Sequence, residues 1–267
     1  MGFNLLKGKR GIITGALDHN SIAWKVAENA SAEGATFVLS NAPVAMRMGE
    51  INKLAEKTNS QIIPADATST EDLEKLFSGA TETLGGKIDF VLHSIGMSPN
   101  VRKQIPYTES NYDFFQKSLD VSAISLHKML SAAMKLDAIN DWGSVVALTY
   151  IAAQRTFPFY GDMADAKALL ESITRSFGYH YGKKKNVRVN TISQSPTKTT
   201  AGSGIKGFEE FFGYAEKMSP LGNASAEACA NYCITLFSDL TRMVTMQNLF
   251  HDGGYSMMGV STDLMSK

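Results

Sequence analysis

Short apolar runs alternate with amphipathic segments along the whole chain. Seven runs rich in aliphatic residues predict β-strands, and they cover residues 9–14, 35–40, 61–66, 88–94, 143–149, 187–192 and 245–254. The segments between them repeat apolar residues with the period of an α-helix. They predict helices over residues 21–33, 44–58, 70–84, 109–137, 160–182 and 225–238.

Strands that alternate with helices are typical of a parallel sheet, because each parallel connection needs a crossover. The predicted strands are also continuously apolar, as expected when helices cover both faces of a sheet. The sequence has no Pro- or Gly-rich linker and no internal repeat. We therefore expect one doubly wound, Rossmann-like α/β domain over residues 1–267, with a parallel sheet of about seven strands.

Small and polar residues gather where the predicted strands end. These ends are Thr14-Gly15, Ser40-Asn41, Asp66-Ala67, Ser94-Ile95-Gly96, Thr149-Tyr150 and Ser193. In doubly wound sheets, ligands bind outside the carboxyl ends of the strands. A sheet with only a structural role needs no such concentration, so the pattern favours a ligand groove.

The first of these ends, ITGALDHNSIAW at residues 13–24, leads almost directly from a strand into a helix. Dinucleotide-binding folds use such a turn to point a helix N-terminus at a pyrophosphate. The usual G-x-G-x-x-G fingerprint has three glycines, whereas this stretch has only Gly15. By itself, the stretch is compatible with a nucleotide loop of different chemistry and with a plain strand–turn–helix.

Tyr160 and Lys167 are seven residues apart, which is close to two turns of the predicted helix, so both fall on one face. A Lys ammonium favours negative charge on a phenol oxygen and can hydrogen-bond ribose hydroxyls. An exposed Tyr and an exposed Lys are common on any helix, and the spacing leaves that alternative open. A Tyr-x-x-x-Lys match at residues 179–183 lies at the far end of the helix, away from the strand ends, and we reject it.

Charge and composition exclude several classes of function. The 26 basic and 26 acidic residues balance, so no overall field attracts nucleic acid or an anionic membrane. We see no membrane span, no secretion signal and no metal signature, and we expect a cytoplasmic protein. The two cysteines, Cys229 and Cys233, are interpreted as small buried side chains, and the lysine run at residues 183–185 as a solvated loop.

Several motifs together carry a resemblance that covers essentially the whole chain. They are GKRGIITGALDHNSIAW (8–24), HSIG (93–96), ALTYIAAQRTFPFYGDMADAKA (147–168), SQSPTKTTAGSGIK (193–206) and HDGG (251–254). On these motifs, the chain resembles the bacterial enoyl-[acyl-carrier-protein] reductases of the FabI type. These enzymes are a divergent branch of the short-chain dehydrogenase/reductase superfamily. Their first loop, G-x5-S-[IL]-[AG], matches Gly15, Ser21, Ile22 and Ala23, which favours the nucleotide loop.

The resemblance implies NADH-dependent reduction of the trans-2 double bond of enoyl thioesters in fatty acid biosynthesis. The family's Tyr-x6-Lys pair falls on Tyr160 and Lys167, and its additional tyrosine falls on Tyr150. Tyr160 would stabilise the enolate oxygen, Lys167 would hold the nicotinamide ribose, and Tyr150 would position the substrate. Ordinary short-chain dehydrogenases carry a Ser about thirteen residues before the Tyr. Ala147 stands there instead, which favours C=C reduction over ketone reduction.

The same resemblance assigns binding residues. Those implied for the cofactor are Gly15, Ser21, Ile22, Ala42, Asp66, Ala67, Ser94, Ile95, Gly96, Lys167, Pro196, Thr197 and Thr199. Those implied for the substrate are Ser98, Phe157, Met163, Ile205 and Phe208, the last two in a substrate-binding loop at about 195–217. Gly202, Gly204 and Gly207 would let this loop close as a lid.

The second strand end has no acidic residue to read a ribose 2′-hydroxyl, and Arg47 follows nearby. NADH is expected as the cofactor, with NADPH as the alternative.

The implied partners are acyl carrier protein and further copies of this chain, as a homotetramer. Some relatives carry further basic residues after the Lys that matches Lys206, where this chain has Glu209 and Glu210. Docking would therefore use Lys198, Lys206 and other surface lysines, or be weak. Two alternatives stay open. One is a ketoacyl or other carbonyl reductase of the same fold, and the other is a non-catalytic, nicotinamide-binding regulatory protein.

Overall fold

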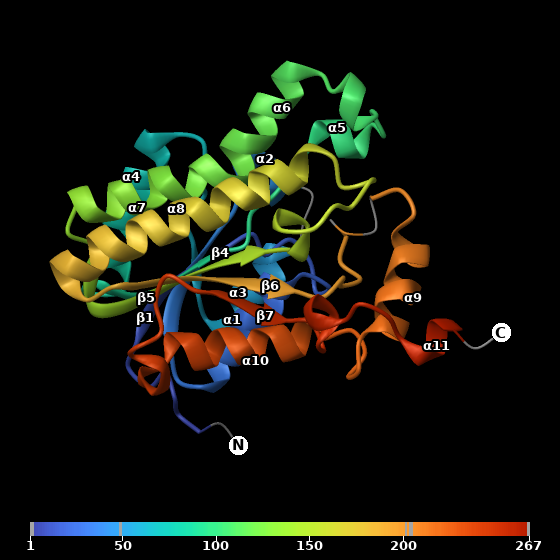
Figure 1. Cartoon of the computed structure of the whole chain (residues 1–267). Helices are drawn as coiled ribbons and strands as arrows, with labels where there is room; N and C mark the ends of the chain where they lie inside the picture. Colours follow the sequence, from blue (N-terminus) through green and yellow to red (C-terminus); the bar gives the residue numbers. More distant parts are fainter. Residues whose placement is uncertain (1–2, 48–49, 201, 203–204, 266–267) are drawn as a thin grey trace.

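A single seven-stranded sheet runs through the protein (Figure 1). The computed structural model describes residues 3–47, 50–200, 202 and 205–265. The strands are β1 (Arg10–Thr14), β2 (Thr36–Ser40), β3 (Gln61–Ile62), β4 (Ile88–His93), β5 (Ile139–Thr149), β6 (Arg188–Gln194) and β7 (Asn248–His251). Their order is β3-β2-β1-β4-β5-β6-β7, and every neighbouring pair is parallel. The expected doubly wound α/β fold is confirmed.

Helices cover both faces of the sheet. One face carries α4 (Thr70–Thr83), α7 (Ser125–Lys135) and α8 (Asp162–Lys185), which lie above the sheet in Figure 1. The other face carries α1 (Ile22–Ala32), α3 (Ile51–Thr58) and α10 (Ala226–Phe237). Shorter or peripheral helices are α2 (Pro43–Met46), α5 (Pro99–Arg102), α6 (Tyr112–Leu119), α9 (Phe208–Met218) and α11 (Thr262–Met265).

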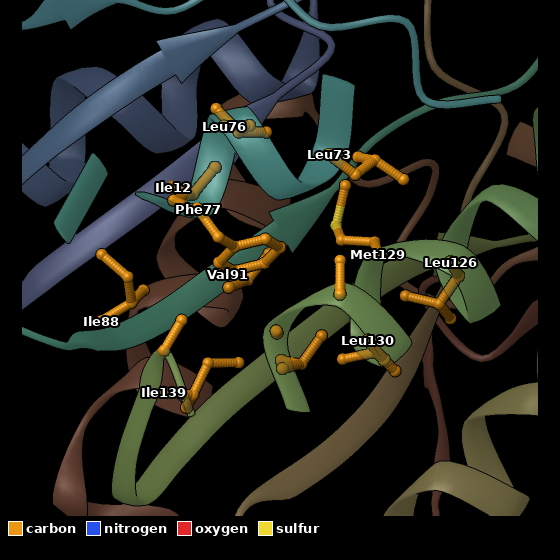
Figure 2. Packing of buried hydrophobic residues seen from close by; sticks show 14 of the residues in the cluster. Ile12, Leu73, Leu76, Phe77, Ile88, Val91, Leu126, Met129, Leu130 and Ile139 are labelled. Atoms are coloured by element: carbon orange, nitrogen blue, oxygen red, sulfur yellow. The ribbon is translucent and has the colours of Figure 1, made fainter. Parts of the chain in front are cut away.

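Each face of the sheet has its own apolar core. In the core shown in Figure 2, Phe77 of α4 and Met129 of α7 pack over Val91 of β4. The second core joins α1 and α10 to the opposite face, where the rings of Phe90 and Phe237 stack with centroids 4.7 Å apart. Burial of large apolar side chains on both faces explains why the strands read as continuous apolar runs.

The strand order switches sides at β1, which lies between β2 and β4. Strands β1, β2 and β3 build outwards to one edge, and β4 then returns to the other side of β1. The loops after β1 and β4 therefore lead away in opposite directions and leave a crevice between them, which is where such sheets bind ligands. Gly15 and Ser94 begin these two loops.

Several element boundaries differ from the sequence expectations. The helix expected at 44–58 is divided into α2 and α3, with residues 48 and 49 outside the described ranges. Strand β3 is only two residues long, because Pro64 follows shortly and has no N–H to donate to the sheet. The helix expected at 109–137 contains a π-helical turn at Asp120–Ile124.

Helix α8 begins after Tyr160 and continues through Lys185, so the lysine run at 183–185 is the last turn of a helix and not a loop. The positive charges lie at the C-terminal end of the helix dipole, and Lys185 also pairs with the carboxylate of Asp137. Cys229 and Cys233 are buried free thiols, as expected. In the described part of the chain, no helix has both the length and the apolar character needed to cross a membrane.

Candidate active site

A cavity of about 1220 Å³ opens at the carboxyl ends of the central strands. Its wall includes the ends of β1, β2 and β4, together with α6 and the π-helical turn. Of the residues expected to bind a cofactor, ten line it: Gly15, Ser21, Ile22, Ala42, Asp66, Ala67, Ser94, Ile95, Gly96 and Thr199. The polar strand ends therefore surround one shared space.

The loop after β1 is shaped by Gly15. Its φ is +88°, and a Cβ at this position would lie 1.9 Å from the carbonyl oxygen of Ser94. Ser21 precedes α1, and its hydroxyl donates to the carbonyl of Asp18 at 2.7 Å instead of capping the helix. Among the described residues, no side chain caps the start of α1, so its first N–H groups suit an anion.

The described cavity wall next to β2 has no acidic side chain at the carboxyl end of that strand. The Asn41 side chain donates to the carbonyl of Ala16, and Ala42 begins the short helix α2. Asp66 orders its own turn by accepting hydrogen bonds from the backbone N–H and the hydroxyl of Thr68. The described wall of the cavity does not include Arg47, which is exposed.

Lys167, on α8, is not among the described residues that line this cavity, but its ammonium lies close to Gly96, which does line it. The lysine side chain is buried, and Nζ donates to the carbonyl of Leu148 at 2.8 Å. Nζ also lies 3.5 Å from the point where a Cβ at Gly96 would stand, so the missing side chain at Gly96 opens the cavity towards the ammonium. Burial disfavours the charged form and lowers the pKa of Lys167 to about 8, while Glu171 opposes this effect.

Tyr160, just before α8, and Tyr150, just after β5, face each other. Their ring centroids are 5.1 Å apart, and Phe157 and Phe211 pack against the Tyr150 ring. Burial raises the pKa of both phenols, so both remain protonated donors at neutral pH. The Tyr150 hydroxyl is buried and has no hydrogen-bond partner among the described residues. A buried donor of this kind suits a polar atom of a ligand.

A family model described as Enoyl-(Acyl carrier protein) reductase matches residues 15–256. The crystal structure of a FabI–NADH complex from Alistipes finegoldii is 64% identical, with a TM-score of 0.98, and the match covers 99% of this chain and 94% of that one. Enoyl-[acyl-carrier-protein] reductase [NADH] 1 of Rhizobium meliloti is 34% identical over 258 residues, covering 96% of this chain and 93% of the relative. The FabI protein of Rickettsia bellii is 34% identical over 261 residues, covering 97% and 98%.

The chain belongs to the enoyl-(acyl carrier protein) reductase family. The expected resemblance to FabI-type enzymes, the expected oxidoreductase class and the expected use of NAD(H) are thereby confirmed.

Several expected site residues do not line the described cavity and make other contacts in this reductase. The described cavity wall includes Thr199 but neither Pro196 nor Thr197, whose hydroxyl donates to the carbonyl of Ser195. Ser98 is buried, and its hydroxyl donates to Asp162. Phe157 packs on Tyr150, Met163 lies beside Gly96, and Phe208 lies near Phe212. Of the three glycines expected in the lid, Gly204 lies outside the described residues.

Two buried carboxylates near the site were not expected from the sequence. Asp162 accepts hydrogen bonds from Ser98, Asn100 and Ser118, and Glu171 accepts them from Thr149 and Gln154. Each lies on α8, and a buried Asp or Glu is rare unless it is paired. The sequence did contain a signal for Glu171. It follows Lys167 by four positions, so it is an acidic residue on a helical face that otherwise packs against the core.

Proposed function

We propose that this chain reduces the trans-2 double bond of an enoyl thioester carried by acyl carrier protein, using NADH, in fatty acid biosynthesis. The observation that carries the proposal is the cavity at the strand ends, which is lined by ten of the residues expected for a dinucleotide and has the Lys167 ammonium close to Gly96 in its wall. The unpartnered Tyr150 hydroxyl and the neighbouring Tyr160 ring add the groups that the substrate needs. The named relatives, which are NADH-dependent enoyl-[acyl-carrier-protein] reductases, support it.

The residues of the cavity wall fit a dinucleotide. Gly15 allows a pyrophosphate to approach the backbone, and the uncapped start of α1 offers N–H groups beside Ser21 and Ile22. Ala42, Asp66 and Ala67 would face the adenosine, and Ser94, Ile95 and Gly96 the nicotinamide half. Pro196, Thr197 and Thr199 would lie over the cofactor. When bound, the dinucleotide supplies a hydride to the β-carbon of the substrate.

Hydride addition leaves negative charge on the thioester oxygen as an enolate. The Tyr160 phenol, kept neutral by burial, would donate a hydrogen bond to that oxygen where the charge develops. Lys167 would hold the ribose hydroxyls and keep the local field positive. Tyr150 would orient the thioester through its free hydroxyl. A proton from water would then add to the α-carbon of the enolate, which completes the reduction. The three residues would therefore do the positioning and the charge stabilisation, and hydride transfer itself needs no protein base.

The acyl chain would lie against apolar residues beside Tyr150. Phe157 and Met163 line this side of the site, and Ile205 and Phe208 belong to the loop at about 195–217 that would cover it. Ser98 would not contact the substrate through its hydroxyl, because that hydroxyl donates to Asp162. It would only help to position the neighbouring wall. One domain would thus carry both the cofactor site and the substrate site.

Acyl carrier protein would dock near Lys206. Lys198 pairs with Glu209 at 2.8 Å, so its charge is partly neutralised, whereas the described contacts leave Lys206 exposed. The chain would assemble as a homotetramer, which light scattering of the purified protein would test. A cytoplasmic location stays a prediction.

The deciding experiment is oxidation of NADH followed at 340 nm with a trans-2-enoyl thioester, beside a 3-ketoacyl thioester and with NADPH in parallel. Turnover on the enoyl substrate with NADH is the expected result. Turnover on the ketone alone would favour the carbonyl reductase alternative. Binding of NADH without turnover of either substrate would favour the regulatory alternative.

A further inference from the structure

Glu171 is a buried carboxylate on α8 that is hydrogen-bonded on both sides of the Tyr150 turn. It follows Lys167 by one helical turn on α8 and is only 5% exposed. Its Oε1 accepts a hydrogen bond from the Thr149 hydroxyl at 3.0 Å, and its Oε2 accepts one from the Gln154 amide at 3.0 Å. Acceptance at both oxygens is the pattern of an ionised carboxylate.

The two donors, Thr149 and Gln154, lie on either side of Tyr150 along the chain. Thr149 is the last residue of β5, and Gln154 follows the 3-10 turn Ile151–Ala153 that comes directly after Tyr150. Lys167 donates to the carbonyl of Leu148 on the same strand. Glu171 and Lys167 therefore join α8 to both sides of the Tyr150 turn, so the geometry of the tyrosine and of the lysine is set by one polar cluster.

The histidine and the tyrosines around this cluster are neutral, so Glu171 is the negative charge that acts on Lys167. On β4, His93 is held neutral by burial, which lowers its pKa to about 3. Burial likewise raises the pKa of Tyr150 and of Tyr160, and both stay neutral. Arg175 favours the ionised form of Glu171, whereas burial raises the pKa of this carboxyl.

We propose that Glu171 is a positioning residue that keeps Lys167 charged and in place for the cofactor and that holds the Tyr150 turn against α8. The inference rests on the role proposed above for Lys167. A carboxylate next to a buried ammonium favours its charged form, and removal of the charge shifts the balance towards the neutral amine.

The proposal predicts a change in the pH dependence of NADH binding. In Glu171→Gln, the shape of the side chain is kept and the charge is lost, so the pKa of Lys167 falls further. The loss of NADH affinity at alkaline pH should then begin roughly one pH unit lower than in the wild type. Above both pKa values, the variant should bind NADH roughly tenfold more weakly than the wild type.

The experiment is a titration of each purified protein with NADH, followed by nucleotide fluorescence, from about pH 6.5 to about pH 9.5. The fall of NADH affinity at alkaline pH is called the alkaline limb of the curve of affinity against pH. Glu171→Asp keeps the charge, so its alkaline limb should shift less than that of Glu171→Gln. Gln154→Ala removes one hydrogen bond but no charge and should leave the limb in place. Glu74→Gln, on the distant helix α4, controls for the loss of a negative charge elsewhere. Circular dichroism confirms that each variant is folded, and if Glu171→Gln is not folded, Glu171→Asp against Gln154→Ala carries the comparison.

An alkaline limb that is the same in Glu171→Gln and the wild type would overturn the inference. A limb that moves equally in Gln154→Ala would also overturn it, because a purely structural role would then be sufficient. Lys167→Ala separates this result from a failure of the proposed function. If Lys167→Ala binds NADH as tightly as the wild type, the role of Lys167 itself is wrong.

Discussion

At the scale of single residues, burial sets the protonation states that the proposed chemistry needs. The Tyr160 phenol and the Lys167 ammonium are both taken out of water, and burial raises the pKa of the first and lowers that of the second. The phenol is therefore a reliable donor, while the ammonium is close to losing its proton above neutral pH. Desolvation and not a specific ion pair is the main cause for both groups.

Tyr160→Phe should lower kcat by roughly two to three orders of magnitude, because it removes one donor to the developing enolate oxygen. The ring remains, so its packing on Tyr150 and the affinity for NADH should change little. Steady-state kinetics with an enoyl thioester and a fluorescence titration with NADH measure the two quantities. Unchanged turnover would remove Tyr160 from the mechanism.

His93 should make the fold sensitive to acid. Its imidazole is buried at the end of β4, with Nε2 2.8 Å from the Ser125 hydroxyl, and its pKa falls from 6.5 to about 3. Below pH 6.5, the unfolded chain binds a proton that the native protein excludes, so stability falls as the pH falls towards 3. By about pH 5, this one group should cost about 2 kcal/mol of unfolding free energy.

Urea denaturation at several pH values checks this expectation by comparing His93→Gln with His127→Gln, which changes an exposed histidine on α7. The His93 variant should lose less stability than the wild type on acidification, whereas the His127 variant should follow the wild type. Identical slopes for all three proteins would contradict the assignment.

At the scale of elements, Asp162 joins the first turn of α8 to the outer wall of the cavity. Its carboxylate is fully buried and accepts from Ser98 and Asn100, at the start of α5, and from Ser118 of α6. Helices α5 and α6 project beyond the sheet in Figure 1, and α6 lines the cavity. One buried group therefore positions a wall of the site relative to Tyr160, two residues earlier.

Asp162→Ala should destabilise the protein by roughly 2–4 kcal/mol, because three buried donors lose their acceptor. The wall should also loosen, so the KM for the enoyl substrate should rise more than the Kd for NADH, whose proposed contacts lie mainly at the ends of β1, β2 and β4. Denaturation and kinetics measure the two effects. Glu109→Ala, an exposed change in the 3-10 turn between α5 and α6, should leave both quantities near the wild-type values.

At the scale of the whole molecule, the site depends on the point where the two halves of the sheet meet. Gly15, after β1, lies against the backbone of Ser94, after β4, and the two apolar cores lie on opposite sides of these strands. A dinucleotide that contacts both loops would bind only the folded arrangement. Cofactor binding is therefore coupled to the stability of the entire fold.

NADH at one hundred times its Kd should stabilise the protein by about 2.7 kcal/mol and raise the thermal midpoint measurably. Gly15→Ala should abolish this increase and lower the midpoint of the free protein, because its Cβ would meet the Ser94 carbonyl at a backbone φ of +88°. Differential scanning fluorimetry with and without NADH tests both statements. A normal NADH-induced increase in Gly15→Ala would refute the placement of the pyrophosphate.

Local patterns in the sequence were sufficient to predict the doubly wound sheet, most helices and the polar strand ends. Each of these rests on periodicity or on a turn residue, and the structure confirms helices such as α4 and α10 within one or two positions. The family motifs added the pairing of Tyr160 with Lys167. The break in the helix after β2 and the two-residue β3 were missed, because competing contacts and Pro64 outweigh local propensity there.

Only the tertiary structure decided which of the candidate residues share a space and which protonation states they hold. Ser98 is a polar residue at a strand end in sequence, yet folding places it on Asp162, and it brings Glu171 beside Thr149, 22 residues earlier. Hydrogen bonds between distant segments, and the desolvation that shifts the pKa of Lys167, depend on what packs around each group. A local pattern carries no record of that packing, which is why the chemistry of the site became apparent only in the fold.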